Sequence, residues 1–85
     1  MKVKFHKNFS KSFKKLPIKI KDQFNKRLKI FLENPSNLLL NNHALHGEWR
    51  SFRSINITGD FRAVYKQLDD YIVEFVVIDT HGNLY

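Results

Sequence analysis

The C-terminal half of the chain contains three consecutive strand-like runs that are joined by links of two residues. The runs are rich in aromatic and β-branched residues, and they cover Trp49–Ile57, Asp60–Leu68 and Tyr71–Asp79. Parallel strands need a crossover of about a dozen residues or more, so links this short allow only antiparallel hairpins. The chain must therefore contain an antiparallel meander of three strands.

The N-terminal part has a different periodicity. Lys2–His6 alternates polar and apolar residues and predicts a short strand. Asn8 is a suitable N-cap for a first helix, which should end near Leu16 because Pro17 disfavours helical geometry in the residue before it. Ile18–Asn34 predicts a second helix. Its apolar residues form one stripe opposite a face of Lys and Arg, namely Ile20, Phe24, Leu28 and Phe31.

These elements predict an α+β fold in the order β-α-α-β-β-β. We expect a four-stranded sheet that contains the meander, with the two-helix hairpin packed on one face. The other face is then partly open and offers a place for a ligand. Residues 35–47 show no clear period and are interpreted as a loop. A chain of 85 residues has no room for a second core, so residues 1–85 should form one domain.

Charge is distributed unevenly along the chain, whose net charge is +7. Residues 1–34 carry eleven Lys or Arg and two acidic residues, whereas residues 35–85 carry four Lys or Arg and six acidic residues. A positive field concentrated in one half attracts polyanions, so RNA, the ribosome, DNA or an acidic protein are candidate partners. The competing interpretation is a solvated lysine-rich helix face.

Composition also narrows the classes of site. The chain has no cysteine, which excludes disulfides, thiolate nucleophiles and zinc sites of the Cys type. His43 and His46 are spaced like metal ligands, but no third ligand stands at a recognisable offset, so we expect neither a metal nor another cofactor. No apolar window is long enough for a membrane span. We expect a cytoplasmic protein with no membrane partner and a core that includes Trp49.

The residues whose side chains could take part in catalysis are His43, Asp60, Arg62 and His81. Metal-free RNA cleavage needs a base for the 2′-hydroxyl proton, an acid for the leaving 5′ oxygen and a cation for the phosphate. Histidine suits the first two roles near neutral pH. The competing interpretations are that Asp60 is a hairpin-turn residue and that Arg62 pairs with an acid such as Glu74 on the next strand.

Three blocks of the sequence resemble successive blocks of toxins of the RelE/ParE superfamily, most closely its YafQ-like branch. They are LHGEWRSFR at 45–53, GDFRAVY at 59–65 and DTHGNLY at 79–85. The resemblance implies a toxin of a type II toxin–antitoxin pair. In the RelE and YafQ branches such a toxin is a metal-independent endoribonuclease that cuts mRNA on the ribosome and is silenced by an antitoxin protein.

The resemblance also implies roles for individual residues. His43 matches a catalytic histidine of YafQ-like toxins, and Asp60 and Phe61 match their Asp-Trp pair. His81 matches their C-terminal histidine and Tyr85 their terminal aromatic residue, whereas Arg62 matches a phosphate-contacting arginine of RelE-like members. We therefore predict His81, Asp60, Arg62 and His43 as catalytic residues. RNA or phosphate contacts are predicted for Arg50, Arg53, Phe61 and Tyr85, the two aromatic residues being suited to stacking on a base.

Two positions depart from the YafQ-like pattern. Asn56 stands where these toxins carry a second catalytic histidine, and Val77 stands where they carry an arginine on the last strand. These departures keep a second function open, that of a non-cleaving, ParE-like toxin that inhibits DNA gyrase or a degenerate toxin that only binds its antitoxin. A third possible function is a plain basic RNA-binding module. It would need exposed aromatic side chains on the sheet, whereas most aromatic residues here occupy positions of apolar periodicity that indicate burial.

Overall fold

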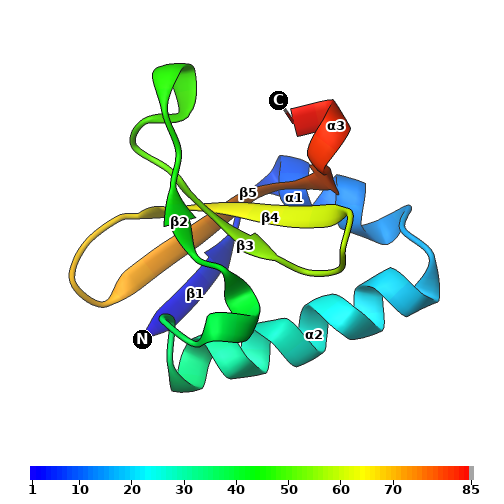
Figure 1. The fold of residues 1–85 in the computed structure, drawn as a ribbon, viewed down its shortest axis with the longest axis horizontal. Helices are drawn as coiled ribbons and strands as arrows, with labels where there is room; N and C mark the ends of the chain where they lie inside the picture. The colour runs from blue at the N-terminus through cyan, green and yellow to red at the C-terminus, as the bar shows by residue number, and fades with distance from the viewer. Residues whose placement is uncertain (85) are drawn as a thin grey trace.

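The computed structural model describes residues 1–84. Its strands are β1 (Lys2–Phe5), β2 (His43–Ala44), β3 (Arg53–Asn56), β4 (Phe61–Gln67) and β5 (Ile72–Thr80). Its helices are α1 (Lys7–Lys14), α2 (Ile18–Glu33) and α3 (His81–Leu84), with two 3₁₀ turns at Leu38–Leu40 and Gly47–Trp49. The strands form one sheet in the order β1-β5-β4-β3-β2 (Figure 1).

The α+β class, the helix pair and the antiparallel β3-β4-β5 meander agree with the prediction, but the predicted four-stranded sheet is wrong. The fifth strand is β2, which lies inside the predicted loop 35–47 and pairs antiparallel with β3. The first predicted run, Trp49–Ile57, is strand only from Arg53, because residues 47–49 form a 3₁₀ turn. β1 pairs in parallel with β5 and forms one edge of the sheet.

The first helix starts two residues earlier than predicted. Its N-cap is His6 and not Asn8, because the His6 Nδ1 atom accepts a hydrogen bond from the Asn8 backbone N–H at 3.1 Å. A backbone N–H can only donate, so Nδ1 carries no proton and the proton of the neutral ring is on Nε2. Pro17 then precedes α2 with an extended ψ of 149°, which separates the two helices as the sequence predicts.

Phe75 of β5 is the centre of the hydrophobic core. Its ring lies 5.4–6.1 Å, between centroids, from the rings of Phe5, Phe9, Phe24, Phe31 and Tyr65. Stacked, edge-to-face and tilted ring pairs of this kind add about 0.5–1.5 kcal/mol each to simple burial. These contacts pack α1 and α2 on one face of the sheet, where rings of β1 and β4, the neighbours of β5, join the same cluster. Trp49 is half-buried and lies outside this cluster, in contrast to the prediction.

The alternation of the strands assigns the remaining side chains to the sheet face opposite α1 and α2, which we call the open face. Ile55, Ala63 and Tyr65 point into the core, so their neighbours along β3 and β4 point to the open face. A bulge between Val64 and Tyr65 adds Val76 to β5, which lets Phe75 and Ile78 both reach the core. The open-face residues of β3, β4 and β5 are Ser54, Asn56, Arg62, Val64, Lys66, Glu74, Val77 and Asp79.

Within residues 1–84, no helix is both long enough and apolar enough to cross a membrane.

We predict that Phe75→Ala lowers the free energy of unfolding by about 3–5 kcal/mol, because truncating a buried aromatic ring leaves a cavity among its partners. Urea unfolding followed by circular dichroism measures the change. Leu38→Ala is the matched control, since Leu38 is 95% exposed and should change stability by less than about 0.5 kcal/mol. Equal effects of the two substitutions would contradict the central role of Phe75.

Candidate functional site

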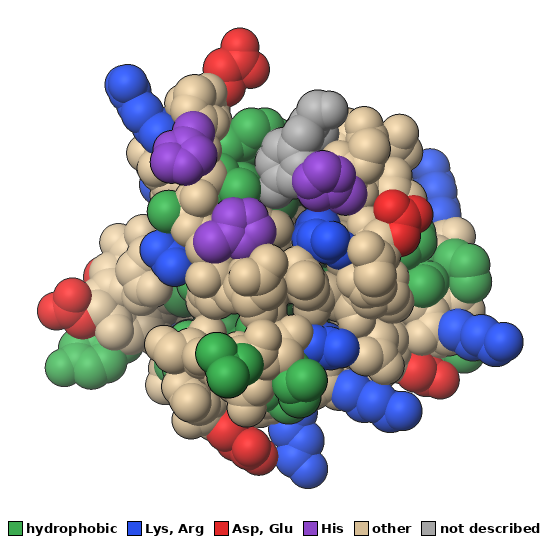
Figure 2. Space-filling model, in the orientation of Figure 1, with side chains coloured by type: hydrophobic (Ala, Val, Ile, Leu, Met, Phe, Trp, Pro, Cys, Tyr) green, Lys and Arg blue, Asp and Glu red, His purple; other side chains and the backbone are tan. Residues whose placement is uncertain are grey.

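The strand register aligns the open-face residues in rows that run across the sheet. One row joins His43, Ser54, Val64 and Val77, from β2 to β5. The next joins Asn56, Arg62 and Asp79. Neighbouring strands lie about 4.8 Å apart, so His43 and Arg62, on strands separated only by β3, lie on one surface. Figure 2 shows histidine side chains gathered on the viewed face, with Lys or Arg side chains near them.

Arg62 is anchored to the turn between β3 and β4. Its Nη1 atom donates to three backbone carbonyls, those of Thr58 at 2.9 Å, Gly59 at 3.2 Å and Phe61 at 3.1 Å. In the strand register an acid does stand opposite Arg62, but it is Asp79, whereas Glu74 stands opposite Lys66. The guanidinium group therefore has a fixed position at one end of the open face.

Asp60 and His81 meet at the same turn. The His81 backbone N–H donates to the Asp60 carbonyl at 2.8 Å, and both side chains are exposed. His81 begins α3, and the Asp79 carboxylate anchors the start of that helix by accepting from the Thr80 N–H at 2.7 Å and from Asn83 Nδ2 at 3.1 Å. The backbones of Asp60, Arg62 and His81 are thus joined at one end of the open face.

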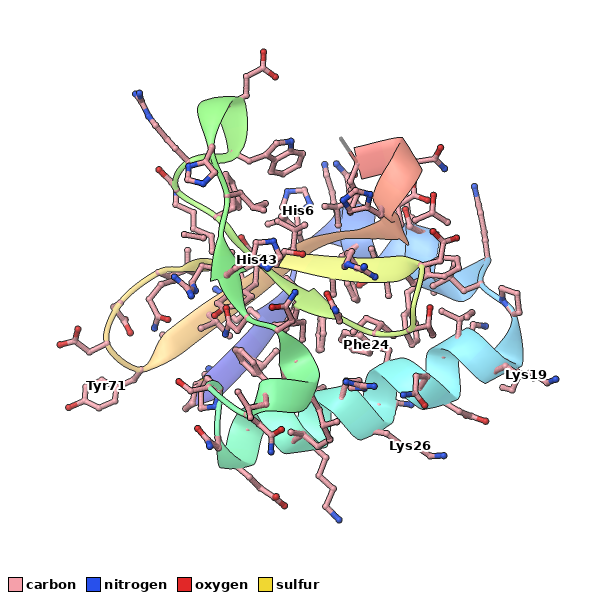
Figure 3. The ribbon with its side chains drawn as sticks, in the orientation of Figure 1. His6, Lys19, Phe24, Lys26, His43 and Tyr71 are labelled. Carbon is pink, nitrogen blue, oxygen red and sulfur yellow. The ribbon has the colours of Figure 1, made fainter. Side chains whose placement is uncertain are left out.

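His43 is held by a hydrogen bond of its own ring. The Nδ1 atom lies 2.8 Å from the Asn41 carbonyl oxygen, and a carbonyl can only accept, so Nδ1 carries the proton. In the neutral ring Nε2 is then an unprotonated nitrogen that can accept a proton. Asn41 takes a left-handed conformation, with φ of 45°, at the end of the 3₁₀ turn 38–40. Figure 3 shows His43 on β2, in front of the sheet.

Asn42 fixes the backbone that carries His43. Its Nδ2 atom donates to the Pro35 carbonyl at 3.0 Å and to the Tyr65 hydroxyl at 2.8 Å. Its Oδ1 atom accepts from Arg53 Nε at 2.8 Å. One side chain therefore ties the loop after α2 to β3 and β4, which is how a strand of two residues is kept in register.

The other predicted residues do not join this group. Arg53 lies on the core side of β3, opposite Tyr65, and is bonded to Asn42. Phe61 packs partly buried against the core, so it is on the wrong face to stack on a base bound beside Arg62. Arg50 is exposed at the end of the 3₁₀ turn 47–49. Tyr85 lies outside the described residues.

The sequence analysis missed Asn42 and Asp79. Asp79 could have been found from alternation, because it lies opposite Arg62 in a meander with two-residue links. Asn42 has no local signal, since its three partners are seven to 23 residues away in the sequence.

The two departures noted in the sequence, Asn56 and Val77, both lie on the open face beside Arg62 and Val64, respectively. The Asn56 Oδ1 atom and the Ser54 Oγ atom are buried without a hydrogen-bond partner among the described residues. Within residues 1–84, no group of three His, Asp or Glu side chains is placed to hold a metal ion. The chemistry available to this face is that of imidazole, carboxylate and guanidinium groups.

The fold is that of the bacterial toxins of the RelE/ParE superfamily. The family described as the YafQ bacterial toxin of type II toxin–antitoxin systems matches residues 1–85, so the chain belongs to the YafQ family. Comparison with curated protein sequences gives no match.

Solved structures share the fold at low sequence identity. YafQ from E. coli strain BL21(DE3) superposes with a TM-score of 0.79 at 22% identity, covering 98% of this chain and 96% of that one. The YoeB/ParE toxin from Agrobacterium tumefaciens gives 0.78 at 18% identity, covering 95% and 99%. YafQ in the E. coli DinJ–YafQ toxin–antitoxin complex gives 0.76 at 23% identity, covering 98% and 94%.

We predict that Asn42→Ala lowers the free energy of unfolding by about 1–3 kcal/mol, because it removes three hydrogen bonds and leaves the buried Tyr65 hydroxyl without its partner. The backbone amide of His43 should also exchange faster with deuterium, as β2 loses its attachment. Hydrogen exchange and urea unfolding measure these effects. Asn25→Ala, at an exposed position of α2, is the control. An unchanged exchange rate of the His43 amide in Asn42→Ala would contradict the role of Asn42 in holding β2 in place.

Proposed function

We propose that this toxin is a metal-independent endoribonuclease that cuts mRNA, with translating ribosomes as the setting and the cytoplasm as the location. The observation that carries the proposal is the fixed His43 ring, whose Nδ1 donates to Asn41 and whose Nε2 is thereby an acceptor. It lies on the same sheet face as Arg62, whose turn also joins Asp60 and His81. Residues 1–85 are proposed to act as a single domain.

The proposed reaction assigns the two proton transfers to His43 and His81. His43 Nε2 removes the proton of the 2′-hydroxyl as the 2′ oxygen forms its bond to phosphorus. The bond from phosphorus to the 5′ oxygen breaks, and that oxygen takes a proton from His81. The products are a 2′,3′-cyclic phosphate and a 5′-hydroxyl end. His43 and His81 come from opposite sides of β4, which suits an attacking and a leaving oxygen on opposite sides of the phosphorus.

Arg62 is assigned to the charge that develops on the phosphate. Its Nη1 atom is used by the turn carbonyls, and the other guanidinium N–H groups are assigned to the phosphate oxygens. Since Val77 replaces the arginine of the YafQ-like pattern, Arg62 would carry this role without help from β5. Asp60, bonded through its backbone to His81, is assigned to stabilise the protonated imidazole. Arg50 remains a proposed outer phosphate contact.

An antitoxin is the proposed protein partner. The similar E. coli YafQ is found in a complex with the antitoxin DinJ. Helices α1 and α2 carry most of the basic residues of this chain, so an acidic antitoxin segment is the complementary partner.

A second candidate function is favoured by Asn56 and Val77, which replace a histidine and an arginine on the open face. A toxin without those groups would bind its target without cutting RNA, as proposed for a ParE-like inhibitor of DNA gyrase or for a degenerate toxin bound only by its antitoxin. The two candidates differ in what an arrested cell contains. An endoribonuclease leaves cleaved mRNA, whereas an inhibitor of gyrase leaves intact mRNA and DNA with reduced negative supercoiling.

We predict that expression of the wild-type chain arrests growth and produces new mRNA ends with 5′-hydroxyl groups. His43→Gln, His81→Ala and Arg62→Ala should each reduce cleavage by about 10²–10⁴-fold, the range for a lost proton-transfer or charge-stabilising group. End mapping by RNA sequencing measures the effect. Lys26→Gln is the control, because Lys26 points away from the sheet on α2 (Figure 3).

Cleavage that persists in all three site variants would overturn the assigned site. Intact messages together with inhibited DNA supercoiling would instead support the gyrase-directed candidate. Growth arrest with neither effect would reject both activities. Circular dichroism of each purified variant separates loss of a catalytic group from loss of the fold.

A further inference from the structure

A hollow lies on the open face, toward the end of β4 that is away from Arg62. It has a volume of about 510 Å³ and is lined by His6, Asn8, Trp49, Phe52, Lys66, Glu74, Val76 and Val77. The rings of Trp49 and Phe52 meet edge to face at 5.3 Å, and the Lys66 ammonium lies 5.6 Å from the Phe52 ring centre. None of the residues assigned to catalysis lines this hollow. Figure 2 shows hydrophobic surface between the protruding loop that follows β2 and α3.

The polar groups of the hollow include both hydrogen-bond donors and acceptors. His6 accepts through Nδ1 from the Asn8 N–H, so its Nε2–H group is a donor. Glu74 contributes carboxylate acceptors. Its register partners are Lys66 on β4 and Lys4 on β1, so one carboxylate stands between two lysine side chains. Aromatic walls with a few polar groups at the edge match a flat, heteroatom-edged ring.

The hollow lies on the same sheet face as the proposed cleavage site. Arg62, Val64 and Lys66 alternate along β4 on the same face, and at about 3.4 Å per residue Lys66 lies some 14 Å from Arg62. A short single-stranded RNA segment spans that separation. The cation at each end would contact the backbone, and Lys4 adds a third positive charge beside the hollow. A strand bound at Arg62 is therefore long enough to reach Trp49 and Phe52, passing over the covered position of Val64.

We propose that this hollow, which we call the aromatic subsite, binds one nucleobase of the RNA strand on one side of the scissile phosphate. The base stacks on Trp49 or Phe52, Lys66 contacts the neighbouring phosphate, and Glu74 accepts from an exocyclic amino group. Adenine, cytosine and guanine carry such a group and uracil does not. The inference rests on the proposed function for the identity of the strand, and it adds a determinant of sequence preference.

The test uses Trp49, the only tryptophan of the chain, as the reporter. The probe is a short 2′-O-methyl RNA oligonucleotide, which lacks the attacking hydroxyl and therefore stays intact. We expect saturable quenching of Trp49 fluorescence. Moving a single abasic position along the oligonucleotide should abolish the quenching at one position only. Uracil at that position should bind more weakly than cytosine.

Substitutions separate the subsite from general electrostatic attraction. Phe52→Leu should weaken binding by roughly 5- to 150-fold, which corresponds to the loss of one stacked base. Glu74→Gln should remove the difference between cytosine and uracil. Tyr71→Leu is the control for loss of an exposed aromatic side chain, and Lys26→Gln is the control for Lys66→Gln, because both control residues lie away from the open face (Figure 3).

Messenger cleavage by the same variants in a translating extract makes the two proposals separable. Cleavage by the wild type with no position-dependent quenching, and with full activity in Phe52→Leu and Glu74→Gln, overturns the aromatic subsite alone. Position-dependent quenching without any cleavage supports the subsite and rejects the ribonuclease proposal. Quenching by an added antitoxin peptide but not by the oligonucleotide would identify a protein segment as the occupant and overturn the inference.

Discussion

The packing of Phe75 against five other rings determines how the rest of the molecule is arranged. It brings rings of β1, α1, α2 and β4 to one side of β5, so both long helices cover the same face of the sheet. Among residues 1–84, no helix beyond the short α3 and the segment around Trp49 is left to cover the other face. The open face is therefore available for polar chemistry because the aromatic core and the two longer helices lie on the other side of the sheet.

Alternation along β4 then separates structural from functional side chains. Ala63 and Tyr65 are buried in the core, while Arg62 and Lys66 point the other way. A shift of one residue in the pairing of β4 would exchange the two sets and place charged groups in the core. The bulge at Val76 maintains the same division on β5, because it allows Phe75 and Ile78 to share the core face although they are three residues apart. Core packing and the open face are thus specified by the same register.

Much of this arrangement can be predicted from the sequence, and the predictions that were wrong or missing have physical causes. The meander is predictable because two-residue links permit only hairpins, and the placement of Phe61 in the core could have been predicted from its alternation with Ala63 and Tyr65. Strand β2 could not, since two residues have no periodicity and its position depends on the distant partners of Asn42. The same limit applies to Arg53, whose bond to Asn42 is a tertiary contact. The parallel pairing of β1 with β5 likewise joins the two ends of the chain.

Two histidines show how the backbone assigns different chemistry to identical side chains. His43 donates through Nδ1 to a carbonyl, whereas His6 accepts through Nδ1 from an N–H group. The exposed Nε2 is consequently an acceptor in neutral His43 and a donor in neutral His6. In the proposed function the first is suited to removing a proton beside Arg62, and the second to recognising a base beside Glu74. Val77 lies in the row of His43 and also lines the aromatic subsite. In the proposed function, an apolar side chain at this junction suits contact with a base better than contact with a second phosphate.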